Sequence, residues 1–313
     1  MPMDVGSIDE SNELDPTGEV DLEDPRAVEQ AIHAILSRLY GKDYDSALLS
    51  QGLSDVVRAF RGDYPGLLRC DTLYHDLRHA LETGLTMTRI LDGHVQSLPP
   101  GSKDPIDAHH ALLGVLLALF HDIGLLRRDT EAAIWGPTLT PIHEERGVDF
   151  MTRYLADTAL APLAELARLI MSTKLLFKMP DTWSILDQKL ASMVASADLL
   201  SQLADRYYLE KCRDFLFVEF SAFGLAGKPD SPYPDRETLL AKTPGFFEGI
   251  IRGRLEQEFH GVFRLLEFHC CGRNPWEEAI WRNLTYLGEV LSSRDFARLR
   301  RQPKPFIGET MPN

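Results

Sequence analysis

The amino-acid sequence predicts an all-α fold. Apolar residues recur at spacings of three and four through most of the chain, which is the period of a helix with one buried face. Residues that start and stop helices bracket these stretches, and the strict apolar–polar alternation of half-buried strands is absent from the sequence. The 313 residues, 44% of them apolar, are enough for one large or two smaller domains with a sizeable core.

Capping residues mark the helix boundaries. Asp24 is a suitable N-cap, Pro25 a suitable first helical residue and Gly41 a suitable end, so the first helix is predicted between them. Asn274 and Pro275 mark a later helix start in the same way. The predicted helices cover residues 27–40, 44–60, 73–91, 106–123, 140–157, 162–174, 181–210, 246–268 and 274–291.

Composition divides the chain into four segments. Residues 1–24 hold nine acidic side chains and no Lys or Arg, so we expect a disordered acidic tail there. Residues 25–223 are predicted to form the main helical domain. A loop rich in proline and glycine opens residues 224–302, whose helices are expected to pack on the same body. Residues 303–313 are predicted to be an irregular tail.

Charge and cysteine usage limit the classes of function. After the acidic tail, 38 acidic residues face 33 Lys and Arg, so the basic excess that duplex nucleic acid requires is lacking. The longest apolar run has ten residues, which is too short for a membrane span, and no secretory leader is recognisable. We therefore expect a cytoplasmic protein without a membrane partner. The four cysteines lack zinc-ligand spacing and are predicted to be buried thiols, namely Cys70, Cys212, Cys270 and Cys271.

The most informative feature is the pair His121 and Asp122, which follows the apolar run of residues 111–120. Both side chains are ligands for divalent metals, and both are costly to bury against a core without a partner. A metal ion would be such a partner. The helix that carries them is expected to stop at Gly124.

Two more segments contain side chains of the same kind. His75 and His79 are four residues apart, so on one helix they share a face. Asp198 lies within an apolar helical stretch, where an unpaired carboxylate would cost several kcal/mol. Asp187 and Asp205 have more polar neighbours and are predicted to be surface charges.

Together these segments resemble the HD-domain superfamily of metal-dependent phosphohydrolases, whose pattern is a histidine, a His-Asp doublet and a distant aspartate. The resemblance covers roughly residues 70–210, and residues 74–80 are similar to the histidine segment of cyclic-nucleotide phosphodiesterases. It implies that His75 protonates the leaving oxygen of a phosphoester. It also implies a helical bundle with these metal ligands: His79, His121, Asp122 and Asp198.

The chain departs from the family pattern at several positions. His143 is a candidate for a further metal ligand or a phosphate contact, but Lys174 stands where a later histidine is expected. Lysine is charged at neutral pH and is a poor ligand, so we predict one metal per chain, with Lys174 as a cation for phosphate charge. Leu125 stands where the phosphodiesterases place another histidine, which weakens a strict cyclic-nucleotide assignment.

The predicted ligand set points to metal-assisted hydrolysis. Two histidines and two carboxylates suit Mn, Fe, Co, Ni or Zn, and Mg less well. The ion would polarise a phosphoryl oxygen and lower the pKa of water, which Asp122 would orient. The leading prediction is a phosphohydrolase for a small phosphorylated substrate, with nucleotides and cyclic nucleotides among the candidates. Two alternatives stay open, a di-iron oxygenase of the same superfamily and a non-catalytic, metal-binding regulatory module.

Overall fold

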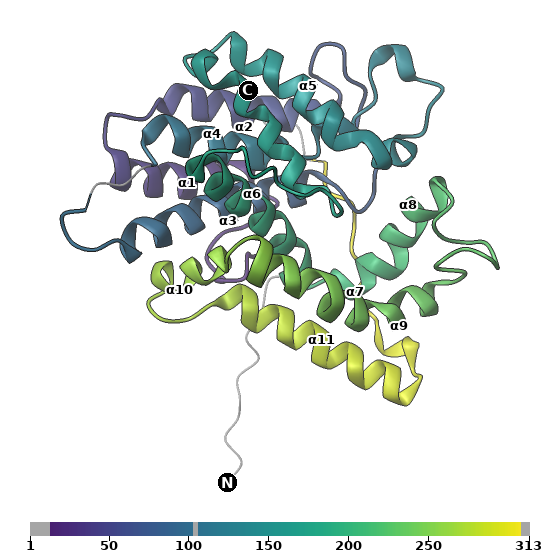
Figure 1. Cartoon of the computed structure of the whole chain (residues 1–313). Coiled ribbons are helices and arrows are strands. Elements are labelled where there is room, and N and C mark those ends of the chain that lie inside the picture. Colours follow the sequence, from purple (N-terminus) through teal and green to yellow (C-terminus); the bar gives the residue numbers. More distant parts are fainter. Residues whose placement is uncertain (1–12, 103–105, 308–313) are drawn as a thin grey trace.

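The computed structural model describes residues 13–102 and 106–307, and these residues form an all-α protein (Figure 1). Within these ranges β structure is limited to three isolated bridges, so the predicted fold class is confirmed. The α-helices are α1 (Pro25–Tyr40), α2 (Ser46–Arg61), α3 (Leu77–Ser97), α4 (Ala108–Phe120), α5 (His143–Ala156), α6 (Ile185–Ala204), α7 (Tyr208–Lys211), α8 (Phe217–Ala222), α9 (Arg236–Phe246), α10 (Leu265–His269) and α11 (Pro275–Ser293). The 3₁₀ and π segments are η1 (Ile123–Leu125), η2 (Asp129–Glu131), η3 (Gly136–Ile142), η4 (Ala161–Thr173), η5 (Cys212–Leu216), η6 (Phe247–Ile251), η7 (Arg254–Glu258), η8 (Val262–Arg264) and η9 (Phe296–Arg298).

Side-chain caps begin many of these helices. At the start of α1, the Asp24 carboxylate accepts a hydrogen bond from the backbone N of Arg26 at 2.9 Å, and Pro25 occupies the first turn. The helix ends at Gly41, whose φ of 57° favours glycine. Side-chain caps also begin other helices, namely Asp45 for α2, Asp76 for α3, Asp107 for α4, Ser184 for α6, Asp235 for α9 and Asn274 for α11.

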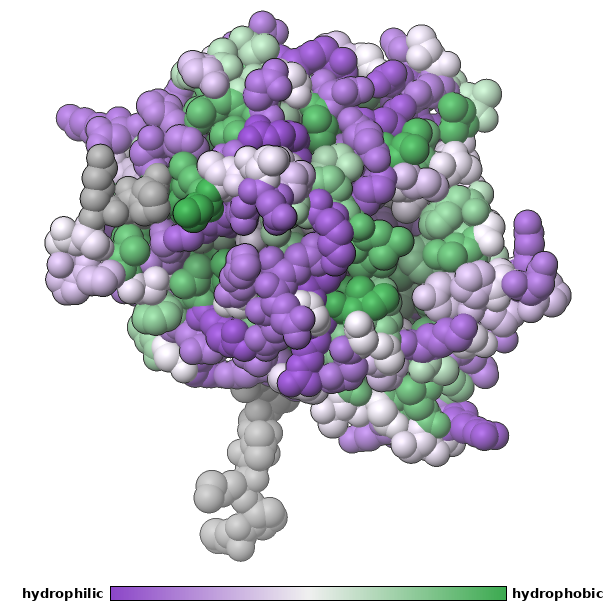
Figure 2. Space-filling model, viewed as in Figure 1, coloured by the Kyte–Doolittle hydropathy of each residue, from purple (hydrophilic) through white to green (hydrophobic). Residues whose placement is uncertain are grey.

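The α4 helix lies in the middle of the hydrophobic core. Its residues from Ala111 to Phe120 are all buried, and α2, α3 and α6 pack around it. The stretch Ala108–Leu125 is long and apolar enough to cross a membrane by composition, but 89% of it is buried inside the protein, as in a core helix. The face of the molecule in Figure 2 is mostly hydrophilic, with smaller hydrophobic areas between polar ones.

The helices after α8 pack on the same core as the earlier ones. Helix α10 lies against α3 and α11 against α6, and buried residues from both parts of the chain form one hydrophobic cluster (Figure 1). The loop predicted after residue 224 is shorter than expected, because Asp235 caps α9. The helix predicted over residues 246–268 is interrupted, because His260 and Gly261 adopt positive φ values and turn the chain between η7 and η8.

The acidic segment at the start of the chain is ordered where the structure describes it. The sequence predicts disorder over residues 1–24, which is wrong for residues 13–24, whereas residues 1–12 lie outside the described residues. Asp15 is buried and forms an ion pair with the buried guanidinium of Arg89 on α3. The segment also buries two apolar side chains, Val20 and Leu22. These few contacts are enough to dock a segment whose overall composition is that of a disordered chain.

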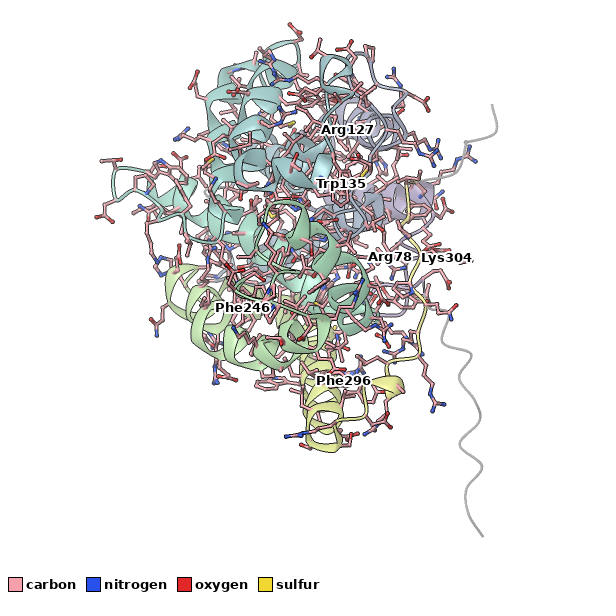
Figure 3. The ribbon with its side chains drawn as sticks, turned by 90° about the vertical axis from the view of Figure 1, so that its right-hand side faces the viewer. Arg78, Arg127, Trp135, Phe246, Phe296 and Lys304 are labelled. Atoms are coloured by element: carbon pink, nitrogen blue, oxygen red, sulfur yellow. The ribbon has the colours of Figure 1, made fainter. Side chains whose placement is uncertain are left out.

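The C-terminal residues 303–307 have no regular secondary structure, as predicted, but they are held at the start of α3. The carbonyl oxygen of Phe306 accepts a hydrogen bond from the backbone N of Leu77 at 2.9 Å. The backbone N of Phe306 donates to the carboxylate of Asp76 at 2.8 Å. Figure 3 shows this extended yellow stretch, with Lys304 labelled.

Candidate metal centre

His79 lies in the first turn of α3, where the helix cap fixes its backbone. The Asp76 carboxylate accepts a hydrogen bond from the backbone N of His79 at 3.1 Å, as an N-cap residue does. The hydroxyl of Thr83 donates to the carbonyl oxygen of His79 at 2.8 Å. His79 is only 5% exposed, so its side chain points into the protein.

His121 and Asp122 follow α4 directly, and both are buried. The helix ends at Phe120 rather than at Gly124, and Gly124 has a different role. A Cβ at Gly124 would lie 1.9 Å from the carbonyl oxygen of His143, so only glycine lets η1 pack this closely on the first turn of α5. The short spacing from the doublet to Gly124 therefore brings His143 beside Asp122.

Three of the predicted ligands come together in one buried group. The Nε2 atoms of His79 and His121 lie 3.2 Å apart. The Oδ2 atom of Asp122 lies 3.5 Å from the first of these nitrogens and 3.2 Å from the second. One ligand atom from each residue lies within 4.8 Å of the others. This His-His-Asp group, called the metal group below, could hold a metal ion, as the sequence predicts.

Asp198, on α6, faces the same two nitrogens. Its Oδ1 atom lies 3.2 Å from Nε2 of His79 and 3.4 Å from Nε2 of His121. The same oxygen accepts a hydrogen bond from the amide of Gln202, one turn further along α6, which orients the carboxylate. Side chains from α3, from α6 and from the end of α4 therefore meet at one point.

Two features of the hydrogen bonding suit a cation at this point. The Nδ1 atom of His121 lies 2.8 Å from the carbonyl oxygen of Ala118 and donates to it, so a metal ion would replace the proton on Nε2, the nitrogen that faces the metal group. The Oδ2 atom of Asp122 is buried and makes no hydrogen bond within the described part of the chain. A carboxylate oxygen and an imidazole nitrogen that converge in this way fit a metal ion.

The charges of this site shift one another's pKa values. Burial disfavours the charged form of His121, but the facing carboxylates of Asp122 and Asp198 outweigh burial and raise its pKa well above the ordinary value. Burial likewise opposes ionisation of Asp122, but the imidazoles of His121 and His75 outweigh it and hold the pKa of Asp122 well below the ordinary value. Asp122 is therefore ionised at neutral pH, which is the form that binds a metal.

His75 lies beside the metal group but is not on α3, contrary to the prediction from its spacing. It precedes Asp76, the cap residue of that helix. The Nδ1 atom of His75 lies 2.7 Å from Oε2 of Glu219, whose other oxygen accepts a hydrogen bond from the backbone N of Tyr74 at 2.6 Å. The ring centroids of His75 and His79 are nevertheless only 6.2 Å apart.

Glu219 sets the charge of His75. Burial lowers the pKa of His75, but the carboxylate of Glu219, followed by that of Asp122, outweighs burial and raises this pKa to about 9. His75 is therefore protonated at neutral pH. The sequence contains no signal for Glu219, because it is a single acidic residue in a short helix that lies 144 positions from His75.

His143, at the start of α5, contacts the second oxygen of Asp122. Its Nε2 atom lies 3.3 Å from Oδ1 of Asp122, while its Nδ1 atom lies 2.6 Å from the carbonyl oxygen of Thr140. Asp122 therefore lies between His143 on one side and the two histidines of the metal group on the other. The converging ligand atoms of that group come from His79, His121 and Asp122 without a contribution from His143.

The ammonium group of Lys174 is paired with acidic residues of α5. Its Nζ atom lies 2.7 Å from Oε1 of Glu145 and 3.4 Å from Oε2 of Glu144. That oxygen of Glu144 in turn lies 3.3 Å from Nδ1 of His143. Lys174 is therefore connected to the site through Glu144 and His143, and two carboxylates already balance its charge.

His75 and His143 form the less buried side of the site. Their side chains are 13% and 12% exposed, whereas those of His121 and Asp122 are 0% and 3% exposed.

Two acidic residues that the sequence assigns to the surface are buried instead. Asp187 pairs with Arg168 at 2.6 Å, and Asp205 pairs with Lys211 at 2.6 Å. Each carboxylate is stabilised in the interior by a cation from a neighbouring segment. The polar residues next to each aspartate in the sequence do not predict this pairing.

The prediction that all four cysteines are buried is correct for two of them. Cys70 and Cys212 are buried, and burial raises the pKa of each thiol to about 12. Cys270 is partly exposed and Cys271 is exposed, because the chain turns to the surface after α10.

Comparison of the chain with models of protein families, with curated proteins and with solved structures gives no match. The function is therefore inferred from the site itself. Its main features are a buried His-His-Asp group, a further carboxylate at Asp198 and a protonated histidine, His75, beside the group.

Proposed function

We propose that this protein is a metal-dependent phosphohydrolase that cleaves a small phosphoester. One observation carries the proposal: the buried group of His79, His121 and Asp122 lies next to protonated His75, which is on the less buried side of the site. A divalent ion bound there supplies Lewis acidity toward a phosphoryl oxygen and toward water. We assign one ion per chain, with Asp198 as the fourth ligand.

Asp122 and His143 have roles that follow from their contacts. Asp122 presents Oδ2 to the metal group and Oδ1 to His143, so one carboxylate can both ligate the ion and orient a water molecule. The hydrogen bond to Thr140 holds the His143 ring with Nε2 directed at Asp122. At this position His143 binds the attacking water or a phosphate oxygen.

His75 is the general acid in this proposal. Hydrolysis forms a bond from water to phosphorus and breaks the bond from phosphorus to the leaving oxygen, which then needs a proton. A side chain that is protonated at the working pH can donate it. Glu219 occupies Nδ1 of His75 and stabilises the imidazolium, so the proton on Nε2 is the one available to the substrate.

The donor set bears on the choice of metal. Two imidazole nitrogens and two carboxylates suit Mn, Fe, Co, Ni or Zn better than Mg, which prefers oxygen ligands and bound water. Lys174 already has two carboxylate partners, so we assign it to holding the first turn of α5, and with it His143, rather than to binding phosphate.

Metal analysis followed by activity assays tests the proposal. Protein purified without a chelator should contain about one transition-metal ion per chain and should hydrolyse at least one member of a panel of phosphomonoesters, phosphodiesters and cyclic nucleotides. His121→Ala should lose the metal and the activity together. Two irons per chain with oxygen consumption would indicate an oxygenase, and bound metal without either activity would indicate a regulatory module.

A further inference from the structure

A second cavity lies between α3, the end of α6 and α11, next to the N-terminal segment. Its volume is about 550 Å³, which is within the usual range for small-molecule sites. None of the four proposed metal ligands lines it, so it is distinct from the metal centre. Four arginines line it, namely Arg78 of α3, Arg206 after α6, Arg282 of α11 and Arg301 of the C-terminal stretch.

The acidic residues that line this cavity have other partners or are uncharged at neutral pH, and Arg78 pairs at 3.6 Å with Glu23, which does not line it. Asp15 and Asp205 line the cavity but are already paired with Arg89 and Lys211, which do not line it. Glu82 is buried, and burial, followed by the charge of Asp205, raises its pKa to about 8, so it is neutral at pH 7. The acidic residues that line the cavity are therefore not the partners of Arg282 and Arg301.

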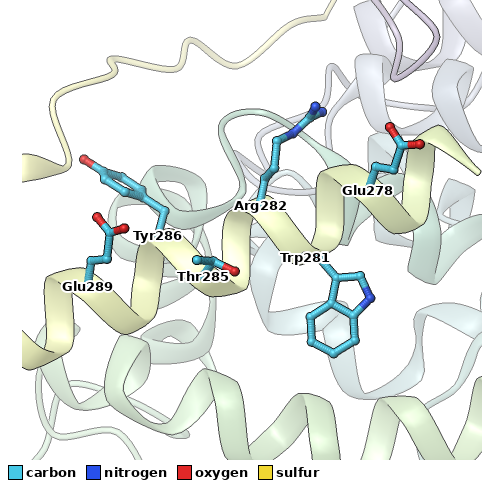
Figure 4. Close-up of a pocket in the computed structure, with 6 residues that line it drawn as sticks. All are labelled: Glu278, Trp281, Arg282, Thr285, Tyr286 and Glu289. Atoms are coloured by element: carbon cyan, nitrogen blue, oxygen red, sulfur yellow. The ribbon is translucent and has the colours of Figure 1, made fainter.

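Two of the arginines have side-chain donors that are available to a ligand. Arg282 makes no hydrogen bond or ion pair with another residue in the described ranges. Figure 4 shows its guanidinium on the side of α11 opposite to Trp281. Arg301 donates through Nη1 to the backbone carbonyl oxygen of Arg206 at 2.7 Å, and its other guanidinium N–H groups make no hydrogen bond within the described residues.

The walls of the cavity are joined by hydrogen bonds. The amide of Asn283 on α11 donates to the carbonyl oxygens of Leu203 and Asp205 at the end of α6, at 2.9 Å in both cases. The hydroxyl of Tyr286 donates to the carbonyl oxygen of Arg298 at 2.8 Å, which ties the C-terminal stretch to α11. A ligand that enters this preformed cavity therefore orders few groups on binding, which favours affinity.

We infer that this cavity binds a small phosphorylated molecule with at least two negative charges, at a site separate from the metal centre. The planar guanidinium group forms paired hydrogen bonds with phosphate oxygens, and several arginines around one cavity suit a diphosphate better than a single phosphate. This binding does not depend on hydrolysis at the metal centre.

The cavity and the metal centre share two helices. Arg78 directly precedes His79 on α3, and Asp205 directly follows α6, which carries Asp198. A ligand that joins α3 to the end of α6 stabilises the helices that hold metal ligands. By linkage, a ligand that raises the affinity for metal is itself bound more tightly when the metal is present.

Calorimetric titration of the full-length, metal-loaded protein with inorganic pyrophosphate tests the inference. We expect saturable binding of one pyrophosphate at the cavity. Arg282→Gln and Arg301→Gln should each weaken this binding by about tenfold or more, because each removes a charged hydrogen-bond donor. Arg252→Gln, which removes an exposed arginine outside the cavity, should bind like the wild type.

The variants also separate the cavity from the metal centre. Any heat from pyrophosphate at the metal is common to the wild type and all three arginine variants, so the differences among them report the cavity. Equal affinity in all of them would overturn the inference, as would binding that disappears in a folded His121→Ala protein. If pyrophosphate bound only after removal of residues 1–12, the natural occupant of the cavity would be the chain's own acidic segment. This result would also overturn the inference.

Discussion

The Nδ1 atom of His75 lies 2.7 Å from Oε2 of Glu219, a buried carboxylate that holds this histidine at the edge of the metal group. As in a helix cap, a fixed acceptor, here the carboxylate of Glu219, orients a donor, here the ring of His75. Because the pKa of His75 is raised to about 9, its acidic form persists through neutral pH and is lost only as the pH rises through that value. The proposed activity should therefore decline above about pH 9.

Glu219→Gln should move that decline to lower pH. The amide keeps the size of the side chain but removes the charge that favours the imidazolium, so the pKa of His75 falls. The dependence of kcat/KM on pH measures the shift, and metal content should stay unchanged. The control is Glu237→Gln, which removes an exposed acidic residue of α9 and should leave the profile as it is. An unshifted profile in Glu219→Gln would mean that Glu219 has only a structural role.

Alanine at His79 and at His75 should separate a ligand from an acid. His79→Ala should lose the metal, because its Nε2 belongs to the metal group. His75→Ala should keep the metal and slow the release of an alkoxide by about 10²–10⁴-fold, the usual contribution of acid–base catalysis. A nitrophenyl ester needs little protonation and should be affected far less. Equal losses on both esters, with metal retained, would argue against the acid role.

Gly124→Ala should damage the site without removing a ligand. The added Cβ would lie 1.9 Å from the carbonyl oxygen of His143, so α5 must move. We expect the free energy of unfolding to fall by about 1–3 kcal/mol, as in other overpacked cores, and the metal affinity to fall with it. Gly288→Ala on α11 is the matched control, since nothing lies within 4 Å of its Cβ. Chemical denaturation of both variants measures the difference, and similar stabilities would contradict this packing.

Asp15→Asn should destabilise the whole protein. It leaves the buried guanidinium of Arg89 without its carboxylate partner, which costs about 3–5 kcal/mol at buried ion pairs. Removal of residues 1–24 should therefore lower the melting temperature by several degrees, whereas removal of residues 1–12 alone should leave it nearly unchanged. Equal melting temperatures for the two truncated proteins would show that residues 13–24 contribute no stability.

The same ion pair predicts a dependence on pH. Burial raises the pKa of Asp15, but Arg89 and the hydrogen bonds to the carboxylate outweigh burial and lower the pKa in the folded state. Such a group stabilises the fold above its unfolded pKa of about 3.9, and this contribution is lost as the pH falls through the folded-state pKa. The difference in unfolding free energy between wild type and Asp15→Asn should be constant near neutral pH and shrink below about pH 4. A difference that stays constant in strong acid would contradict the pairing.

Helix starts and the metal group were predictable because both depend on short stretches of sequence. The caps Asp24 and Asn274 act within a few residues of themselves, and their helices begin where the sequence predicts. His121 and Asp122 follow a run of apolar residues that is long enough to require burial. The neighbouring sequence alone therefore predicts that both side chains are buried and that they need a partner such as a metal ion.

Other features could not be predicted because they depend on contacts between distant segments. Glu219 reaches His75 only after α8 has come to lie beside the residues that precede α3. Asp15 and Arg89 are 74 positions apart in the chain, so the average composition of the acidic segment does not predict their contact. The turn at His260 could not be predicted either, because the apolar residues on both sides of it keep the spacing of an uninterrupted helix.

The measurement that tests the central claim most directly is the metal content of the protein purified without a chelator, beside that of two histidine variants. We predict about one transition-metal ion per chain in the wild type and in His109→Ala, whose histidine is exposed on α4, and almost none in His121→Ala with the same helical content. Wild-type protein without metal after incubation with each candidate ion, or His121→Ala with as much metal as the wild type, would contradict the account.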